Sequence, residues 1–157
     1  MSVIDKKERE NAAAKFFAYH KLDWCLYEIT DKEYDCIFTL TNWETIQAQI
    51  VWADQDLIDI LVEASKTKEM AWWLIDPIKN IVSSIDKKNK HYSSEVLENM
   101  ILLVRITSGL INHEYLLEHT KKVCEESGFK NIYYIKLPYP LDTMGTLWIN
   151  WDILKLK

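Results

Sequence analysis

The chain has 157 residues, of which 48% are hydrophobic and 27% charged, and it contains only three glycines and three prolines. This is the size of one domain and the composition of an ordinary globular protein, with little room for linkers or disorder. We therefore expect a single domain over residues 1–157. The formal net charge of −5 and the pI near 5.4 weaken the case for strong binding to phosphate backbones. Nucleic acid is thus disfavoured as the primary ligand, and a basic protein is the favoured partner.

Residues 1–15 are charged where a signal peptide needs an apolar stretch, and no later run approaches the ~20 apolar residues that cross a bilayer. We expect a cytoplasmic protein that does not enter membranes. The three cysteines, Cys25, Cys36 and Cys124, are odd in number and lack the spacing of metal ligands. We expect them to be free, buried and apolar in character.

The first predicted element is a helix over residues 5–21. Its apolar residues Ala13, Phe16 and Phe17 are spaced by three or four positions and so line one face. Three strands are predicted next, joined by short polar turns, at residues 24–29, 34–40 and 45–52. Such short links favour antiparallel neighbours, so we expect a meander.

Helical patterns occupy the middle of the chain. Asp54 can cap a helix that runs to about residue 66, and Pro77 fits the first turn of a second helix that runs to residue 92. Between them, residues 70–75 suit either a short strand or a helix. The second helix carries the polar residues Lys87, Lys88 and Lys90 on the side opposite its apolar stripe.

The last third alternates between element types. An apolar strand is predicted at residues 100–106, a helix at 112–127 that Gly128 ends, a strand at 131–137 and an edge strand at 147–154. The middle three elements predict a βαβ crossover between parallel strands. The fold class is therefore α/β (α+β), with a central mixed sheet, an N-terminal helix, an antiparallel meander, a βαβ crossover and helices that flank the sheet.

The aromatic residues have two interpretations. Most of the seven tryptophans lie on predicted strands or beside apolar runs, so packing explains them better than a stacking platform for bases. Trp72 and Trp73 are the exception, because adjacent residues of a regular element cannot both face the same core. We expect one of this pair to be an exposed anchor for a partner.

Three segments carry a resemblance to a known family. They are Glu10 within ERENAAAKFFAY, Asp35 at the head of the second strand in EYDCIFTL, and the third strand, IQAQIVW. Together with the element order, they resemble the PD-(D/E)XK, or restriction-endonuclease-like, superfamily. In active members, residues placed like Asp35 and Gln47 hold a divalent metal, and a lysine at the position of Gln49 orients the attacking water.

The resemblance implies metal-assisted phosphodiester hydrolysis, in which oxygen ligands hold Mg²⁺. Alternation in the third strand places Gln47 and Gln49 on one face. A neutral amide at Gln49 cannot replace the charge or the proton transfer of lysine, and Asp35 would be the sole charged ligand from the strands, with Glu10 as a supplement. Equally, Asp35 suits a structural role in which its carboxylate accepts backbone N–H groups.

Two functions follow from these observations. The first is a non-catalytic binding protein without a cofactor that blocks a basic partner through carboxylates such as Asp54, Asp56 and Asp59. Acidic immunity proteins that neutralise bacterial toxins are similar in size and charge. The alternative is a Mg²⁺-dependent nuclease whose missing lysine is supplied by Lys88 or by a neighbour on the same helix, Lys87 or Lys90.

Overall fold

The computed structural model describes residues 6–30, 34–53, 77–106, 111–137 and 152–157. Its helices are α1 (Lys6–His20), α3 (Pro77–His91), α4 (Ser94–Leu97) and α5 (His113–Glu126). Its strands are β1 (Leu26–Ile29), β2 (Cys36–Thr39), β3 (Thr45–Trp52), β4 (Met100–Ile106), β5 (Asn131–Lys136) and β6 (Asp152–Lys155). No helix among these residues is long and apolar enough to cross a membrane.

All six strands form one mixed sheet in the order β1-β2-β3-β4-β5-β6. The strands β1, β2 and β3 are antiparallel neighbours, which confirms the predicted meander. The pair β4 and β5 is parallel and is connected through α5, which confirms the predicted crossover. The parallel pairing of β3 with β4 joins the two units, and β6 closes the far edge as an antiparallel neighbour of β5.

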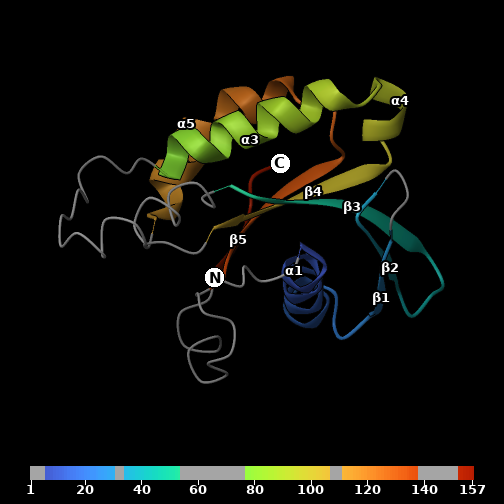
Figure 1. Cartoon of the computed structure of the whole chain (residues 1–157). Helices are drawn as coiled ribbons and strands as arrows, with labels where there is room; N and C mark the ends of the chain where they lie inside the picture. Colours follow the sequence, from blue (N-terminus) through green and yellow to red (C-terminus); the bar gives the residue numbers. More distant parts are fainter. Residues whose placement is uncertain (1–5, 31–33, 54–76, 107–110, 138–151) are drawn as a thin grey trace.

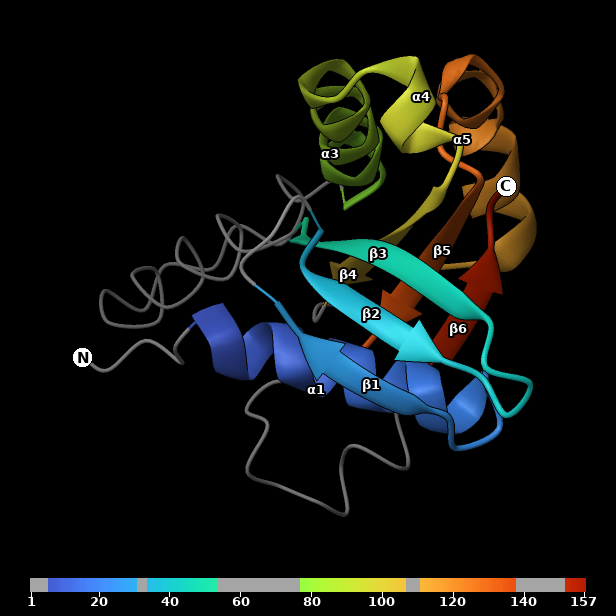
Figure 2. The same ribbon diagram turned by 90° about the vertical axis from the view of Figure 1, so that its right-hand side faces the viewer.

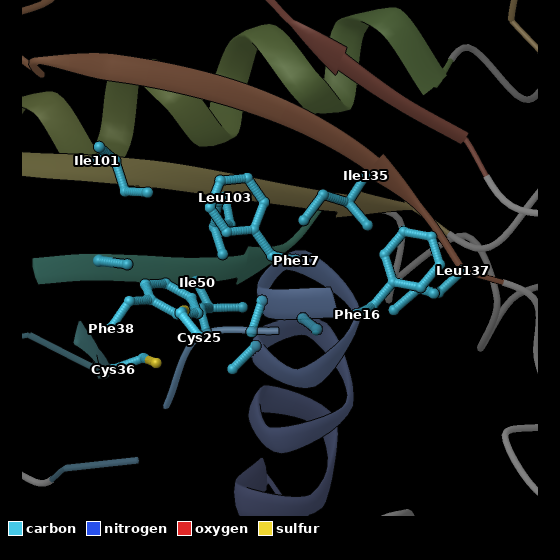
Figure 3. Close-up of a cluster of buried hydrophobic side chains, with 14 residues drawn as sticks. Phe16, Phe17, Cys25, Cys36, Phe38, Ile50, Ile101, Leu103, Ile135 and Leu137 are labelled. Atoms are coloured by element: carbon cyan, nitrogen blue, oxygen red, sulfur yellow. The ribbon is translucent and has the colours of Figure 1, made fainter. Parts of the chain in front are cut away.

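The helices form layers on the two faces of the sheet (Figures 1 and 2). One face is covered by α1, whose Phe17 ring contacts the rings of Phe38 and Tyr133. Figure 3 shows this first cluster, with side chains of α1 directed toward those of β3, β4 and β5. The other face is covered by α3 and α5, whose Ile81 and Leu116 belong to a second cluster.

The central strand β4 explains why two separate cores form. Every residue of β4 is buried, because both of its faces are covered by helices. Ile101 and Leu103 contribute to the first cluster, whereas Leu102 and Val104 contribute to the second. The uninterrupted apolar run MILLVRI is therefore the sequence of a strand buried on both sides.

The ends of α5 are held by side-chain hydrogen bonds. The side chain of Asn112 caps the helix by accepting from the Tyr115 N–H at 3.1 Å. Just after the C-terminal end of α5, the Gly128 N–H donates to the Asn89 side-chain oxygen at 2.8 Å. This hydrogen bond connects the turn after α5 to α3. The predicted helix at residues 112–127 thus has the right position, with Asn112 as its cap rather than its first residue.

Candidate functional site

Asp35 has its carboxylate engaged by the backbone. Its Oδ2 accepts the N–H of Ile50 at 2.9 Å, and its own N–H donates to the carbonyl oxygen of Ala48 at 2.9 Å. These two bonds fasten the start of β2 to β3. Asp35 therefore has the structural role that the sequence left open, and the bond to Ile50 occupies one of its two carboxylate oxygens.

Gln47 and Gln49 lie on the same face of β3, as the alternation predicts. Their neighbour Val51 packs against the second cluster, whereas Ala48 and Ile50 belong to the first. Gln49 is only 2% exposed, so its amide is removed from bulk water. A buried neutral amide can neither supply positive charge nor act as a general acid or base.

Glu10 reaches the sheet from the opposite side. It is 7% exposed on α1, the helix that covers the face of Ala48 and Ile50. Burial, the largest cause, raises the pKa of the Cys36 thiol to about 12, and the nearby charges of Asp35 and Glu10 act in the same direction. Glu10 thus belongs to the helix that covers the face of Cys36, Ala48 and Ile50, whereas Gln47 and Gln49 lie on the other face of β3.

Metal ligands do not gather among the described residues: that part of the chain contains no group of three or more His, Cys, Asp or Glu side chains arranged to hold an ion. The three cysteines are free and buried, as predicted. His113 instead forms a surface pair, with its Nε2 at 2.5 Å from Oδ2 of Asp152. This contact links the start of α5 to β6.

Two of the three candidate lysines line a pocket. Lys87 and Lys88 of α3 face Trp52 and Ala53 at the end of β3 across a space of about 420 Å³. The Asn80 amide donates to the carbonyl oxygen of Ala53 at 3.2 Å and so fixes the helix against the strand. Lys90 instead pairs with Asp86 at 2.9 Å on the exposed side of the helix.

The pocket lies beside the glutamines without including them. The described residues that line it come from the end of β3, from Ala53 just beyond it, and from one polar face of α3. Neither Gln47 nor Gln49 is among them. A lysine of α3 in the place of the missing catalytic lysine therefore stays a prediction.

Arg105 is a buried cation that sequence reasoning missed. It is 1% exposed in β4, and its guanidinium carbon lies 5.0 Å from the centroid of the Trp52 ring. A planar cation over an indole ring is the geometry of a cation–π contact. The only signal in the sequence is a charge near the end of the apolar run MILLVRI.

The acidic and tryptophan residues expected to bind a partner fall in one segment. Residues 54–76, which contain Asp54, Asp56, Asp59, Trp72 and Trp73, lie outside the described residues. Their proposed role is neither supported nor opposed by the structure. The described residues contribute a different surface.

Three large apolar residues, Trp24, Leu26 and Trp43, are exposed at one end of the sheet, and together they are called the exposed patch. Their exposed fractions are 72%, 71% and 81%. Leu26 pairs with Thr39 at the end of β2, and Trp43 lies in the turn that follows. The beginning of β1 and the β2–β3 turn lie at the same end of the sheet (Figure 2). The expectation that tryptophans on or near strands serve packing is therefore wrong for Trp43, whereas the ring of Trp24, although largely exposed, lies with its centroid 3.7 Å from that of the Tyr19 ring on α1.

The backbone of this patch is unusual. Trp24 has φ +64° and Trp43 has φ +67°, both in the left-handed region that bulky residues rarely adopt. Hydrogen bonds hold both positions: the N–H of Trp24 donates to Ala18 and that of Trp43 to Leu40, at 2.9 and 3.0 Å. Each such residue costs about 1–2 kcal/mol. Packing in the core does not offset this cost, because both side chains point largely into solvent.

The surroundings of the patch are mainly acidic. Among the described residues 21–30 and 36–45, Asp23, Glu28 and Glu44 are exposed carboxylates, and Lys21 is the one exposed cation. Large exposed apolar side chains with polar neighbours are typical of a protein-interaction surface.

Comparison of the chain with protein-family models, curated proteins and solved structures found no match.

Proposed function

We propose that this chain is a non-catalytic binding protein on a nuclease-like scaffold, and that its partner is a basic protein. The observation that carries the proposal is the patch of Trp24, Leu26 and Trp43, exposed and bordered by carboxylates. In its specific form, the chain acts as an acidic immunity or inhibitor protein that neutralises a bacterial toxin by direct binding.

The energetics of binding support this assignment. Tryptophans are enriched among the few residues that dominate interface energies, where each truncation costs about 2 kcal/mol or more. Carboxylates such as Asp23, Glu28 and Glu44 add attraction for a basic surface and speed association at low salt. The strained backbone at Trp24 and Trp43 is consistent with a functional requirement, because it displays both indoles at a cost in stability.

The chemistry of the nuclease-like positions favours binding over catalysis. Asp35 is engaged in fastening β2 to β3, and Gln49 is a buried amide where active members have a lysine. A catalytic role would need Asp35 to bind a metal through its other carboxylate oxygen and a cation to enter from elsewhere.

The test uses the proteins encoded by genes that neighbour this chain's gene as candidate partners. Each is titrated calorimetrically with the wild-type chain and with a Trp24→Ser, Trp43→Ser double variant. Loss of both indoles is expected to weaken binding at least ~30-fold, because one such residue is worth about 2 kcal/mol. Tyr115→Ser, at an exposed aromatic on α5, serves as the matched control.

Two outcomes oppose the proposal. Either no protein encoded by a neighbouring gene binds, or the double variant binds as well as the Tyr115→Ser control.

The predicted binding role of Asp54, Asp56 and Asp59 is tested separately by charge reversal. We expect those changes to weaken binding more at low salt than at high salt, because screening removes their long-range attraction.

The alternative is a metal-dependent nuclease with a displaced lysine, and the pocket lined by Lys87 and Lys88 at the end of β3 is the observation that favours it. This alternative requires saturable binding of Mn²⁺ as a probe for Mg²⁺, lost in Asp35→Ala. It also requires cleavage of DNA or RNA that Lys88→Ala abolishes. Under the proposed function, neither the wild type nor Asp35→Ala binds Mn²⁺ saturably, and no cleavage is observed.

A further inference from the structure

The strand β1 lies at the end of the sheet, beside the patch. Within the described part of the chain it has a neighbouring strand on one side only, namely β2. The side chains of Tyr27 and Ile29 pack toward α1, and the hydroxyl of Tyr27 donates to the Asn11 side chain at 2.9 Å. Leu26 and Glu28 are exposed and project from the opposite face.

The register shows which backbone groups face outward. In an antiparallel ladder, alternate residues exchange hydrogen bonds with the partner strand. The Thr30 N–H donates to the Asp35 carbonyl at 2.9 Å, so the bonded pairs before it are Glu28 with Ile37 and Leu26 with Thr39. The N–H and C=O groups of Tyr27 and Ile29 therefore point away from β2, toward the open edge.

This edge lacks most of the usual protection against further pairing. Natural edge strands carry lysine or proline, contain a bulge, or are covered. The sequence Leu26-Tyr27-Glu28-Ile29 has neither lysine nor proline, and its ladder with β2 is continuous. Its one charged residue is Glu28.

Glu28 discriminates between possible occupants of the edge. When a second copy pairs antiparallel so that the outward groups of Tyr27 and Ile29 are all used, Glu28 lies directly opposite its own equivalent. Like charges in that position are destabilising, and both chains also carry a net charge of −5. A different chain with lysine or arginine opposite Glu28 gains the favourable cross-strand pair instead.

We propose that the partner binds by strand addition, with an extended basic segment pairing along the outer edge of β1. This mode rests on the proposed function and specifies how it is achieved. The outward groups of Tyr27 and Ile29 supply the main-chain hydrogen bonds, and alternate side chains of the segment meet Leu26 and Glu28. Trp24 and Trp43 lie at the same end of the sheet and contact parts of the partner outside the added segment.

The probe is a library of random 12-residue peptides displayed on phage and selected on the immobilised full chain. We expect the selected peptides to be rich in lysine and arginine with an alternating pattern. Each is then synthesised in two N-methylated forms, in which alternate amides are blocked in one phase or the other. Strand addition uses the N–H of every second residue, so blocking one phase should lower affinity more than tenfold and the other should have little effect.

Two measurements on the chain itself complete the test. Amide hydrogen exchange should slow on peptide binding at Tyr27 and Ile29, while Glu28, already bonded to β2, changes little. Glu28→Lys should weaken binding at least fivefold relative to Glu118→Lys, which makes the same change in net charge on the exposed surface of α5.

The outcomes separate this inference from the proposal beneath it. Strand addition is overturned if binding depends on Trp24 and Trp43 but the two methylated forms of a peptide bind equally, whether both retain affinity or both lose it. It is also overturned if peptide binding leaves the amide exchange of Tyr27 and Ile29 unchanged. In either case the proposed protein binding still stands. If no peptide is enriched and the neighbouring proteins also fail to bind, both inferences are overturned.

Discussion

At the scale of single residues, side chains and backbone make opposing demands at the exposed patch. Trp43 lies in the tight turn between β2 and β3, where the N–H of Leu40 donates to the carbonyl of Glu44 at 2.8 Å. Its φ of +67° suits glycine, and its side chain is 81% exposed. Folding alone would favour a smaller residue at this position, and the proposed partner binding is our reason for an indole there.

Replacing Trp43 with glycine separates the two demands. Trp43→Gly should raise the free energy of unfolding by about 0.5–1 kcal/mol, because relief of the left-handed strain exceeds the entropic cost of glycine. Urea denaturation measures the change, and Thr41→Gly in the same turn is the control, expected to leave stability unchanged or lower. A less stable Trp43→Gly variant would mean that the indole contributes to the fold more than its exposure indicates.

At the scale of elements, caps and short links position the helices against the sheet. The Asn112 side chain occupies an otherwise unpaired N–H of the first turn of α5. The adjacent His113 pairs with Asp152 of β6, so the start of α5 is joined to the edge of the sheet through this residue. Caps of this kind explain why a 14-residue helix begins where it does.

Removal of the cap has a predictable cost. Asn112→Ala should lower the free energy of unfolding by about 1 kcal/mol. Asn112→Ser should keep most of the wild-type stability, because its hydroxyl oxygen can accept the same hydrogen bond. Chemical denaturation of the three proteins compares them directly. Equal stability of the alanine and serine variants would show that the Tyr115 N–H is satisfied by water.

At the scale of the whole molecule, one sheet separates two apolar clusters that share β4. Ile135 lies in the first cluster and Ile81 in the second, and both are fully buried. Because β4 contributes alternate side chains to each cluster, neither cluster can unfold completely while the other keeps β4 in place. The described core should therefore unfold as one cooperative unit.

The matched substitutions Ile135→Val and Ile81→Val test this cooperativity. Each should lower the free energy of unfolding by about 0.5–1.5 kcal/mol, and the double variant should show the sum within about 0.5 kcal/mol, since the sites lie on opposite faces. Circular dichroism and tryptophan fluorescence should report one coincident transition in every variant. Two separate transitions would divide the chain into independently unfolding parts.

Local pattern was sufficient for most elements because their boundaries follow from periodicity and turn chemistry. The strands Thr45–Trp52 and Met100–Ile106 were predicted at their observed bounds, and α1, α3, α5 and β5 to within one residue at each end. The strands β1 and β2 are shorter than predicted, and the single-turn helix α4 was not predicted. A turn of this length has too few residues to show a helical period.

The sequence by itself determined the meander, the crossover, the buried cysteines and the shared face of Gln47 and Gln49, because each depends on near neighbours or on the alternation of one strand. Tertiary structure alone decided that β3 pairs with β4, that Asp35 is occupied by the Ile50 amide, and that Arg105 is buried against Trp52. It also exposed Trp24 and Trp43. These outcomes depend on which distant segments come together, and burial in a folded chain is set by those contacts rather than by the hydrophobicity of the residue alone.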